Sequence, residues 1–285
     1  MFEALLAEEG LPSAYLATIA AVHAPLADAI ADVARQARRP VIIGLCGAQG
    51  SGKSTTAKVL ARLLEAKGLA AAVLSLDDLY LSHAARQDLA RRVHPLLATR
   101  GPPGTHDVAQ GRRILQDVLD GRAVRLPRFD KAADDPAPPA DWAVVGPLDV
   151  LIFEGWCVGA RPQDPHDLVQ PVNALEREAD PEGVWRRWCN DALAGDYQPL
   201  FALIDRLVLL RAPGFEVVRR WRGEQEAKLR QRAGAGMSEA AIDRFIQHYE
   251  RLTRHILARM PAYADAVIDL GGDREPLGVA GALAP

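Results

Sequence analysis

Residues 47–54 read Gly-Ala-Gln-Gly-Ser-Gly-Lys-Ser, which matches the phosphate-binding pattern G-x-x-x-x-G-K-S/T. The segment stands between an apolar β-type run at 41–46 and a helical run from 53 to about 66, which is the order that this loop requires. Glycines lack a Cβ, so the backbone can curl and point its N–H groups at phosphate oxygens, and the following helix adds the positive end of its dipole. The sequence therefore predicts a nucleoside triphosphate site.

The residue types within this loop have separate tasks in holding a triphosphate. Lys53 is expected to reach the β- and γ-phosphates, and the Ser54 hydroxyl is expected to ligate Mg²⁺. The alternative is a glycine turn that contains a lysine and a serine by accident, but lysine is rare in this chain, which disfavours a chance match. We expect ATP to be bound by Gly47, Gln49, Gly50, Ser51, Gly52, Lys53, Ser54 and Thr55.

Apolar runs of β-type recur along the chain after the glycine-rich loop. We expect strands at 41–46, 70–76, 150–153, 206–210 and 266–270. A strand, a loop, a helix and a second strand in succession form a unit whose two strands are parallel. The sequence thus predicts an α/β fold of the P-loop NTPase class, with a parallel β-sheet flanked by helices.

The chain is expected to form one domain with an extension. Residues 1–39 carry apolar positions at helical spacing, which predicts a helical N-terminal extension that either caps the nucleotide domain or binds a partner. Residues 40–285 show no linker and are expected to form a single kinase-like domain. The segment 134–147 is rich in proline and is expected to be a surface loop.

The amino-acid composition limits which binding partners and which cellular compartment are expected for this protein. The 285 residues are 49% apolar and 25% charged, which is ordinary for a globular protein. The net charge of −3 gives no reason to expect nucleic acid as a partner. The three cysteines lack metal or disulfide spacing, the N-terminus resembles neither a signal nor a transit peptide, and no apolar run is judged long enough to span a bilayer. A soluble, cytoplasmic protein without a membrane partner is predicted, and the oligomeric state stays open.

Carboxylates follow two of the predicted strands. Asp77 and Asp78 come after the second strand, and Glu154 ends the third. The carboxyl ends of parallel strands lie at the ligand edge of such a sheet. We therefore predict that Asp77 orients an acceptor hydroxyl and takes its proton, and that Glu154 holds Mg²⁺ opposite Ser54. The alternative is that one aspartate caps the next helix and the other is solvated.

A charged helix is predicted within residues 215–236, and it carries Arg219, Arg220, Arg222 and Arg230. Phosphoryl transfer needs positive charge on the migrating group and exclusion of water, which a mobile arginine-bearing lid supplies. We interpret residues 215–236 as such a lid and Arg222 as its catalytic residue. The alternative is a solvated helix face on which the arginines pair with Glu224 and Glu226.

Two loops, 100–107 and 128–131, are dense in hydrogen-bonding side chains beside glycine and proline. Such loops suit a small polar or anionic acceptor better than an apolar one, and Arg100 is expected to pair with a carboxylate. Asp107 is also placed to cap the helix that follows it. The predicted acceptor-binding residues are Asp78, Tyr80, Arg100, His106, Asp107, Arg128, Lys131 and Trp156.

These segments together resemble D-glycerate 3-kinase and its relatives in the superfamily of phosphoribulokinase, uridine kinase and pantothenate kinase. The resemblance extends from about residue 41 to about residue 270, and the stretches 103–107 and 154–159 are its most specific parts. It implies an enzyme that converts ATP and D-glycerate, a hydroxy acid, to ADP and 3-phosphoglycerate. It also implies that Asp77 is the catalytic aspartate and that Glu154 is the acid that serves the metal. Lys53 is predicted to be catalytic as well, through its contact with the phosphates.

One position departs from the pattern of this family. A basic residue commonly follows the Asp-Lys stretch, whereas here Asp134 and Asp135 are followed by Pro136. Another acceptor, such as a nucleoside, a sugar acid or a pantothenate-like molecule, is therefore an alternative. A regulatory nucleotide-binding protein is a further one, but the chain has no N-K-x-D guanine signature, and Asp77 would then have no role.

Overall fold

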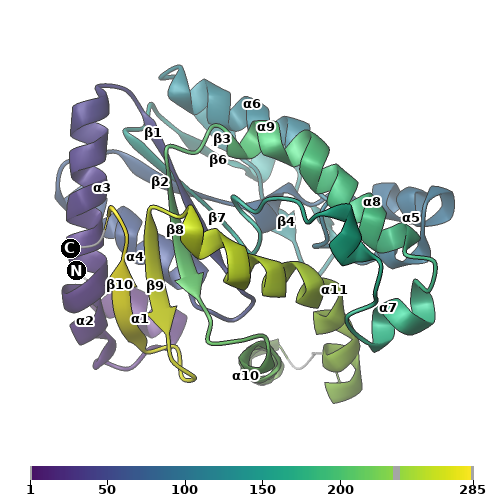
Figure 1. Ribbon diagram of the computed structural model, residues 1–285. Helices are drawn as coiled ribbons and strands as arrows, with labels where there is room; N and C mark the ends of the chain where they lie inside the picture. Colours follow the sequence, from purple (N-terminus) through teal and green to yellow (C-terminus); the bar gives the residue numbers. More distant parts are fainter. Residues whose placement is uncertain (1, 234–237, 284–285) are drawn as a thin grey trace.

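The computed structural model describes residues 2–233 and 238–283 and builds them around a six-stranded β-sheet (Figure 1). The strands lie in the order β10-β9-β8-β1-β7-β2, and every neighbouring pair is parallel except β9 with β10. Their bounds are β1 Val41–Gly47, β2 Ala71–Ser75, β7 Val150–Gly155, β8 Arg206–Arg211, β9 Ala266–Leu270 and β10 Pro276–Ala280. The predicted α/β fold and its five expected strands are confirmed, and β10 is an addition.

Helices cover both faces of this sheet because successive side chains of a strand point to opposite sides. On one side Ile43 joins a core that includes α3 (Ala24–Ala37) and α4 (Lys53–Ala66). On the other side Ile42 joins a core that includes α6 (Val108–Leu119). The other helices have the bounds α1 Glu3–Glu9, α2 Tyr15–Thr18, α5 His83–Arg92, α7 Ala174–Ala179, α8 Val184–Ala192, α9 Gln198–Phe201, α10 Glu216–Ala233 and α11 Glu239–Arg259.

The N-terminal segment contains one long helix, in which α2, a π-helical turn and α3 follow one another without a break. This combined helix, Tyr15–Ala37, has 23 residues and a mean hydropathy of 1.4, so by length and composition it is able to cross a membrane. The expectation that no such run exists was wrong, because the helix continues through Pro25 by way of the π-helical turn Ile19–His23. Leu26 and Ile30 are fully buried in the core that α4 shares, so the helix packs as part of the protein. The cytoplasmic location stays a prediction.

Outside the main sheet, two small antiparallel ribbons are formed, of β3 (Val124–Leu126) with β6 (Ala143–Val145) and of β4 (Phe129–Asp130) with β5 (Asp135–Pro136). The expectation of a surface loop at 134–147 was therefore incomplete, since two short strands lie within it. The β4–β5 ribbon contacts the 3₁₀ turn that follows β2. This contact brings the 128–131 segment to the carboxyl edge of the sheet.

Candidate active site

The carboxyl edge of the sheet brings the three strongest sequence signals together. Glu154 in β7 lies level with Leu45 of β1 and with Ser75 of β2. The glycine-rich loop begins where β1 ends, and Asp77 lies two residues beyond β2 in a 3₁₀ turn. The parallel register therefore places the phosphate-binding loop, Glu154 and Asp77 at one edge, as the sequence predicted.

Two glycines of the loop have backbone conformations that other residues rarely adopt. Gly50 has φ 76° and Gly52 has φ 86°, both in the left-handed region. A Cβ on Gly50 would also lie 2.6 Å from the Cβ of Trp221, so this position is closed to side chains. Arg274 donates a hydrogen bond from Nε to the Gly50 carbonyl at 2.5 Å, and its guanidinium carbon lies 5.2 Å from the centre of the Trp221 ring. Sequence reasoning missed Trp221 and Arg274, because neither belongs to a phosphate-loop motif.

Ser54 and Glu154 form the part of the site that suits a metal ion. The Ser54 hydroxyl donates to Glu154 Oε1 at 2.8 Å, although the residues are 100 positions apart. Glu154 is only 3% exposed, and neither its Oε2 nor Ser51 Oγ has a hydrogen-bond partner among the described residues. Burial raises the pKa of Glu154, against the opposing charge of Lys53. The described part of the protein supplies only two oxygen ligands here. This number suits Mg²⁺, which usually keeps several water molecules in its coordination shell, better than a metal ion that is coordinated by protein atoms alone.

Asp77 lies between two donors from different elements. Tyr80 donates its hydroxyl to Asp77 Oδ1 at 2.6 Å, and Lys131 donates to Asp77 Oδ2 at 2.8 Å. Burial by itself would raise the Asp77 pKa, but the charges of Lys131 and Lys53 and these two hydrogen bonds bring the pKa well below its ordinary value. Asp77 is therefore ionised over the physiological pH range, and its carboxylate is held in a fixed orientation.

Asp78 has a different environment from its neighbour. Its Oδ1 accepts from the Phe129 amide at 3.0 Å, and its Oδ2 lies 3.4 Å from the Arg128 guanidinium. Burial is the largest influence on Asp78 and raises its pKa. The idea that Asp78 caps the next helix was wrong, since Ser82 caps α5 by accepting from the Ala85 amide. Asp78 instead fastens the β4–β5 ribbon to the sheet edge.

Arg100 is held by Asp134, which lies two positions before Pro136, the residue that departs from the family pattern. Arg100 Nη1 forms an ion pair with Asp134 Oδ1, and Asp134 Oδ2 accepts from Arg86. Arg86 is completely buried, so Asp134 neutralises a charge that would otherwise be uncompensated. Both guanidinium groups also lie over the Phe129 ring, at 5.6 Å for Arg100 and 5.7 Å for Arg86. Arg100 is thus fixed beside the sheet edge, with only part of its five N–H donors engaged by Asp134.

His106 is buried and has one nitrogen without a partner. Its Nδ1 is bonded to the Tyr197 hydroxyl, and its ring centre lies 4.9 Å from that of Tyr80. Burial lowers the His106 pKa to about 3, so the imidazole is neutral. Its Nε2 is buried and has no hydrogen-bond partner within the described parts of the chain. A polar ligand atom beside Tyr80 is the simplest means of satisfying it.

Asp107 and Trp156 hold the 100–107 loop in place. Asp107 is the N-cap of α6 and accepts from the Gln110 amide at 2.8 Å, which confirms the predicted cap. Trp156 is buried and donates from Nε1 to the Gly101 carbonyl at 3.0 Å. The structure thus gives both residues a supporting contact, and their binding of an acceptor stays a prediction.

The arginines of α10 do not share one orientation. Arg219 pairs with Asp243 of α11, and Arg220 donates to the Gly272 carbonyl, so both are engaged by partners within the protein. Arg222 bonds to Glu226 and lies 5.1 Å from the centre of the Phe245 ring. Its Nε is buried and has no hydrogen-bond partner in the described part of the chain. The glycines at 234 and 236, which the sequence predicts to permit a hinge-like movement of the lid, and the side chain of Arg230 lie outside the described residues.

Thr55, predicted to contact nucleotide, has its hydroxyl engaged elsewhere. The hydroxyl donates to Glu9 Oε2 of α1 at 2.9 Å, and Lys58 of α4 bonds to the same carboxylate. The first helix therefore packs against the helix that follows the phosphate loop. Any contact of Thr55 with nucleotide has to use its backbone amide.

Known proteins provide an independent comparison. No protein-family model matches the chain. It is 39% identical over 221 residues to "Uncharacterized kinase mug58" of Schizosaccharomyces pombe, a match that covers 74% of this chain and 79% of the relative. It is 31% identical over 258 residues to "D-glycerate 3-kinase, chloroplastic" of Arabidopsis thaliana, covering 84% of this chain and 54% of that protein.

A solved structure agrees with these relatives. The D-glycerate 3-kinase from Cryptococcus neoformans superposes with a TM-score of 0.71 at 27% identity, over 85% of this chain and 89% of that one. The sequence relatives and the solved structure therefore indicate the same family of kinases. The chain belongs to the family of P-loop kinases that includes the D-glycerate 3-kinases.

Proposed function

We propose that this kinase transfers the γ-phosphoryl group of ATP to a hydroxyl of D-glycerate and so forms 3-phosphoglycerate. The observation that carries the proposal is the Asp77 carboxylate, oriented by Tyr80 and Lys131 at the sheet edge that also bears the phosphate loop. Arg100 supplies a cation close to Tyr80, the residue that bonds to Asp77, and such a cation suits a hydroxyl acceptor that itself carries a carboxylate group. The names of the plant and fungal relatives support D-glycerate as that acceptor.

In the proposed reaction Asp77 receives the proton of the acceptor hydroxyl while the oxygen bonds to the γ-phosphorus and the bond to the β-phosphate oxygen breaks. Transition states of this kind are mostly loose, so orientation contributes more than strong basicity, and a carboxylate of low pKa is adequate. Both Asp77 oxygens already accept one hydrogen bond, but each retains a second lone pair for the acceptor. Lys53, the Arg222 guanidinium and the loop amides are proposed to stabilise the phosphate charge.

We propose that Ser54 and Glu154 hold Mg²⁺, with water completing its shell. The buried and unpartnered Glu154 Oε2 supports this assignment. When bound, the ion neutralises charge on the β- and γ-phosphates. Glu154 contributes a buried carboxylate that Lys53 and the ion together keep ionised, although burial alone raises its pKa.

We further propose a division of the chain into a helical N-terminal extension, residues 1–39, and a kinase domain, residues 40–285, with a lid around 215–236. Trp221, which is completely buried against Gly50, anchors the first half of α10. Any closing movement is therefore assigned to the part of the lid beyond Trp221. The bonds of Glu9 to Thr55 and Lys58 support a capping role for the extension.

A coupled assay of ADP release against a panel of hydroxy acids, sugars, nucleosides and pantothenate tests the function. D-glycerate is expected to give the highest kcat/KM, and the product is identified as 3-phosphoglycerate by mass spectrometry and phosphorus NMR. A higher kcat/KM for a nucleoside or for pantothenate would mean that the natural acceptor is not a hydroxy acid. ADP release that is independent of every acceptor would instead favour a regulatory nucleotide-binding protein.

A further inference from the structure

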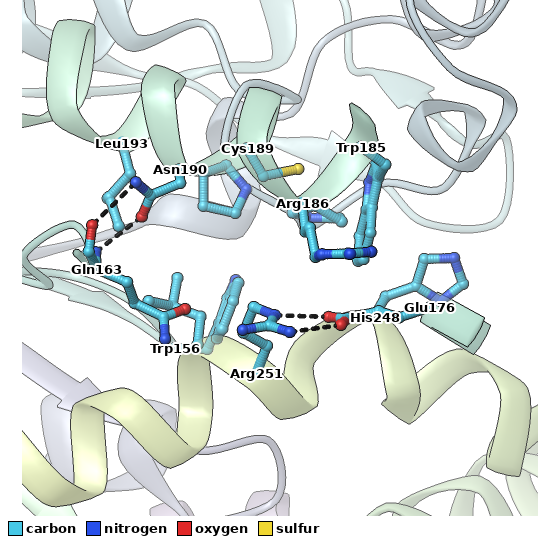
Figure 2. Close-up of a pocket in the computed structure, with 13 residues that line it drawn as sticks. Trp156, Gln163, Glu176, Trp185, Arg186, Cys189, Asn190, Leu193, His248 and Arg251 are labelled. Atoms are coloured by element: carbon cyan, nitrogen blue, oxygen red, sulfur yellow. Dashed lines mark hydrogen bonds and ion pairs between the residues drawn. The ribbon is translucent and has the colours of Figure 1, made fainter. Parts of the chain in front are cut away.

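A cavity lies between α8 and α11, away from the phosphate loop (Figure 2). Its empty space amounts to about 390 Å³ with the open mouth included. Among the proposed active-site residues only Trp156 lines it. Figure 2 shows the side chains of α8 reaching into this space from one side and those of α11 from the other. The cavity therefore borders the 100–107 loop through Pro102 and Pro103, but neither the phosphate loop nor Asp77 nor Glu154 lines it.

Two buried polar side chains of this cavity lack partners. Trp185 of α8 is 3% exposed and His248 of α11 is 8% exposed. Their rings meet edge to face, with centres 5.7 Å apart. Neither Trp185 Nε1 nor His248 Nε2 has a hydrogen-bond partner among the described residues. Because buried polar groups are nearly always hydrogen-bonded, the pair indicates a polar partner beside the two rings, either a ligand atom or a buried water.

The protonation state of His248 determines whether the ligand has to donate or to accept a hydrogen bond at the His248 ring. His248 Nδ1 lies 3.2 Å from the carbonyl oxygens of Arg244 and Phe245, and a carbonyl only accepts, so Nδ1 carries the proton. Burial lowers the His248 pKa to about 4, which leaves Nε2 as a neutral acceptor. Trp185 Nε1 can only donate. A hydroxyl is the simple group that accepts from the tryptophan and donates to the histidine at once.

The charged residues of the cavity already have partners, so the ligand has no need to be an ion. Arg251 bonds to both Glu176 oxygens, at 2.8 and 2.6 Å, and to two backbone carbonyls. Arg186 bonds to Asp180 at 3.1 Å and to backbone carbonyls as well. Apolar residues, among them Leu193, supply other parts of the wall and suit a short carbon chain.

We propose that this cavity binds a small neutral alcohol or polyol, whose hydroxyl accepts from Trp185 Nε1 and donates to His248 Nε2. The site is new with respect to the phosphoryl-transfer centre and does not depend on which acceptor the enzyme phosphorylates. A carboxylate satisfies the tryptophan but not the histidine, so the site is expected to prefer alcohols over acids of equal size.

NMR of the indole N–H groups in the full-length protein tests this proposal. The Trp185 resonance is assigned from its loss in Trp185→Phe, and 1,2-propanediol, glycerol and propionate serve as probes. The two alcohols are expected to shift this resonance along a saturating curve, at least ten-fold more tightly than propionate. His248→Phe is expected to abolish the saturation. Trp142→Phe is the matched control, because the Trp142 indole bonds to the Ala137 carbonyl and does not line the cavity.

A second measurement on the wild-type protein keeps the proposal testable where a variant does not fold. The ¹⁵N shift of His248 Nε2 reports its hydrogen bond directly and is expected to move with the same saturation curve. Shifts that grow linearly without saturation, or an equal response to propionate, would overturn the proposal. So would a crystal structure grown with either alcohol in which water alone bridges the two rings.

Discussion

The Lys131 ammonium lies 2.8 Å from Asp77 Oδ2, although 54 positions separate the two residues in the chain. The β4–β5 ribbon brings the lysine to the end of β2, and its charge is the largest of the influences that lower the Asp77 pKa. Asp77 works as an acceptor of a hydrogen bond and of a proton only when it is ionised. The lysine therefore keeps Asp77 active at acidic pH.

Lys131→Met is expected to shift the acidic limb of the pH profile of kcat/KM. Without this charge, the raising effect of burial on the Asp77 pKa is less opposed, so the pKa rises and activity is lost at a higher pH as the solution is acidified. Initial rates measured from pH 4 to pH 8 check this, because the Asp77 limb of the wild type lies below this range and that of the variant is expected to move toward or into it. Lys67→Met, which removes a lysine paired with Asp28 on the surface, should leave the limb where it is. Identical limbs in wild type and Lys131→Met would show that Lys131 does not set this pKa.

Lys53→Ala is expected to remove most of the activity and to leave the fold intact. Its ammonium is predicted to face the phosphates, and it is not part of either hydrophobic core. Turnover with ATP and far-ultraviolet circular dichroism are measured on the same preparation. Lys58→Ala, one turn further along α4, is the control for a lysine lost from this helix. Turnover at the wild-type rate in Lys53→Ala would contradict the assignment of the phosphate loop.

Arg100→Lys is expected to raise the KM for the acceptor well before the KM for ATP, because lysine does not reproduce the fork of N–H donors that binds a carboxylate. The melting temperature should change little, since Arg100 is partly exposed. Asp134→Asn is expected to lower the melting temperature, because the buried Arg86 loses its counter-charge. Steady-state kinetics and thermal unfolding of both variants separate the two roles. A rise in the KM for ATP alone would assign the 100–107 loop to the nucleotide.

Much of the fold could be predicted because parallel strands buried on both faces are continuous apolar runs. The strands β1, β7, β8 and β9 are largely buried, and β2 is an edge strand that is mostly half-buried but still reads as an apolar run. β10 was missed because it is a short edge strand interrupted by Gly278 and largely exposed, with Leu277 68% exposed. The sequence predicted helices in the N-terminal segment but not their continuity, because a proline inside a helix ordinarily interrupts it, whereas the π-helical turn before Pro25 lets the helix continue.

The residues of the candidate site that lie at the ends of strands could be predicted from the sequence. The phosphate loop, Asp77 and Glu154 each follow or end a strand, so local sequence determines their place. The partners that orient them come from distant segments. Arg274 lies 224 positions from Gly50, and the pairing of Asp134 with Arg100 depends on how the β4–β5 ribbon folds back. No motif encodes such contacts, because they are set by tertiary packing.

The comparison of Asp77→Asn with Asp78→Asn is the most direct test of the mechanism. Asparagine keeps the size of Asp77 and part of its hydrogen bonding but does not accept a proton. General-base catalysis contributes about 10²–10⁴-fold, so kcat should fall on that scale while ATP binding stays near normal. Asp78→Asn should reduce kcat less, because its Oδ1 contact with the Phe129 amide can be made by the asparagine oxygen as well. A severe loss in Asp78→Asn with a mild one in Asp77→Asn would place the reacting hydroxyl at the neighbouring carboxylate. Full activity in both variants would mean that the proton leaves by another route, and the proposed role of the oriented Asp77 carboxylate would then have to be abandoned.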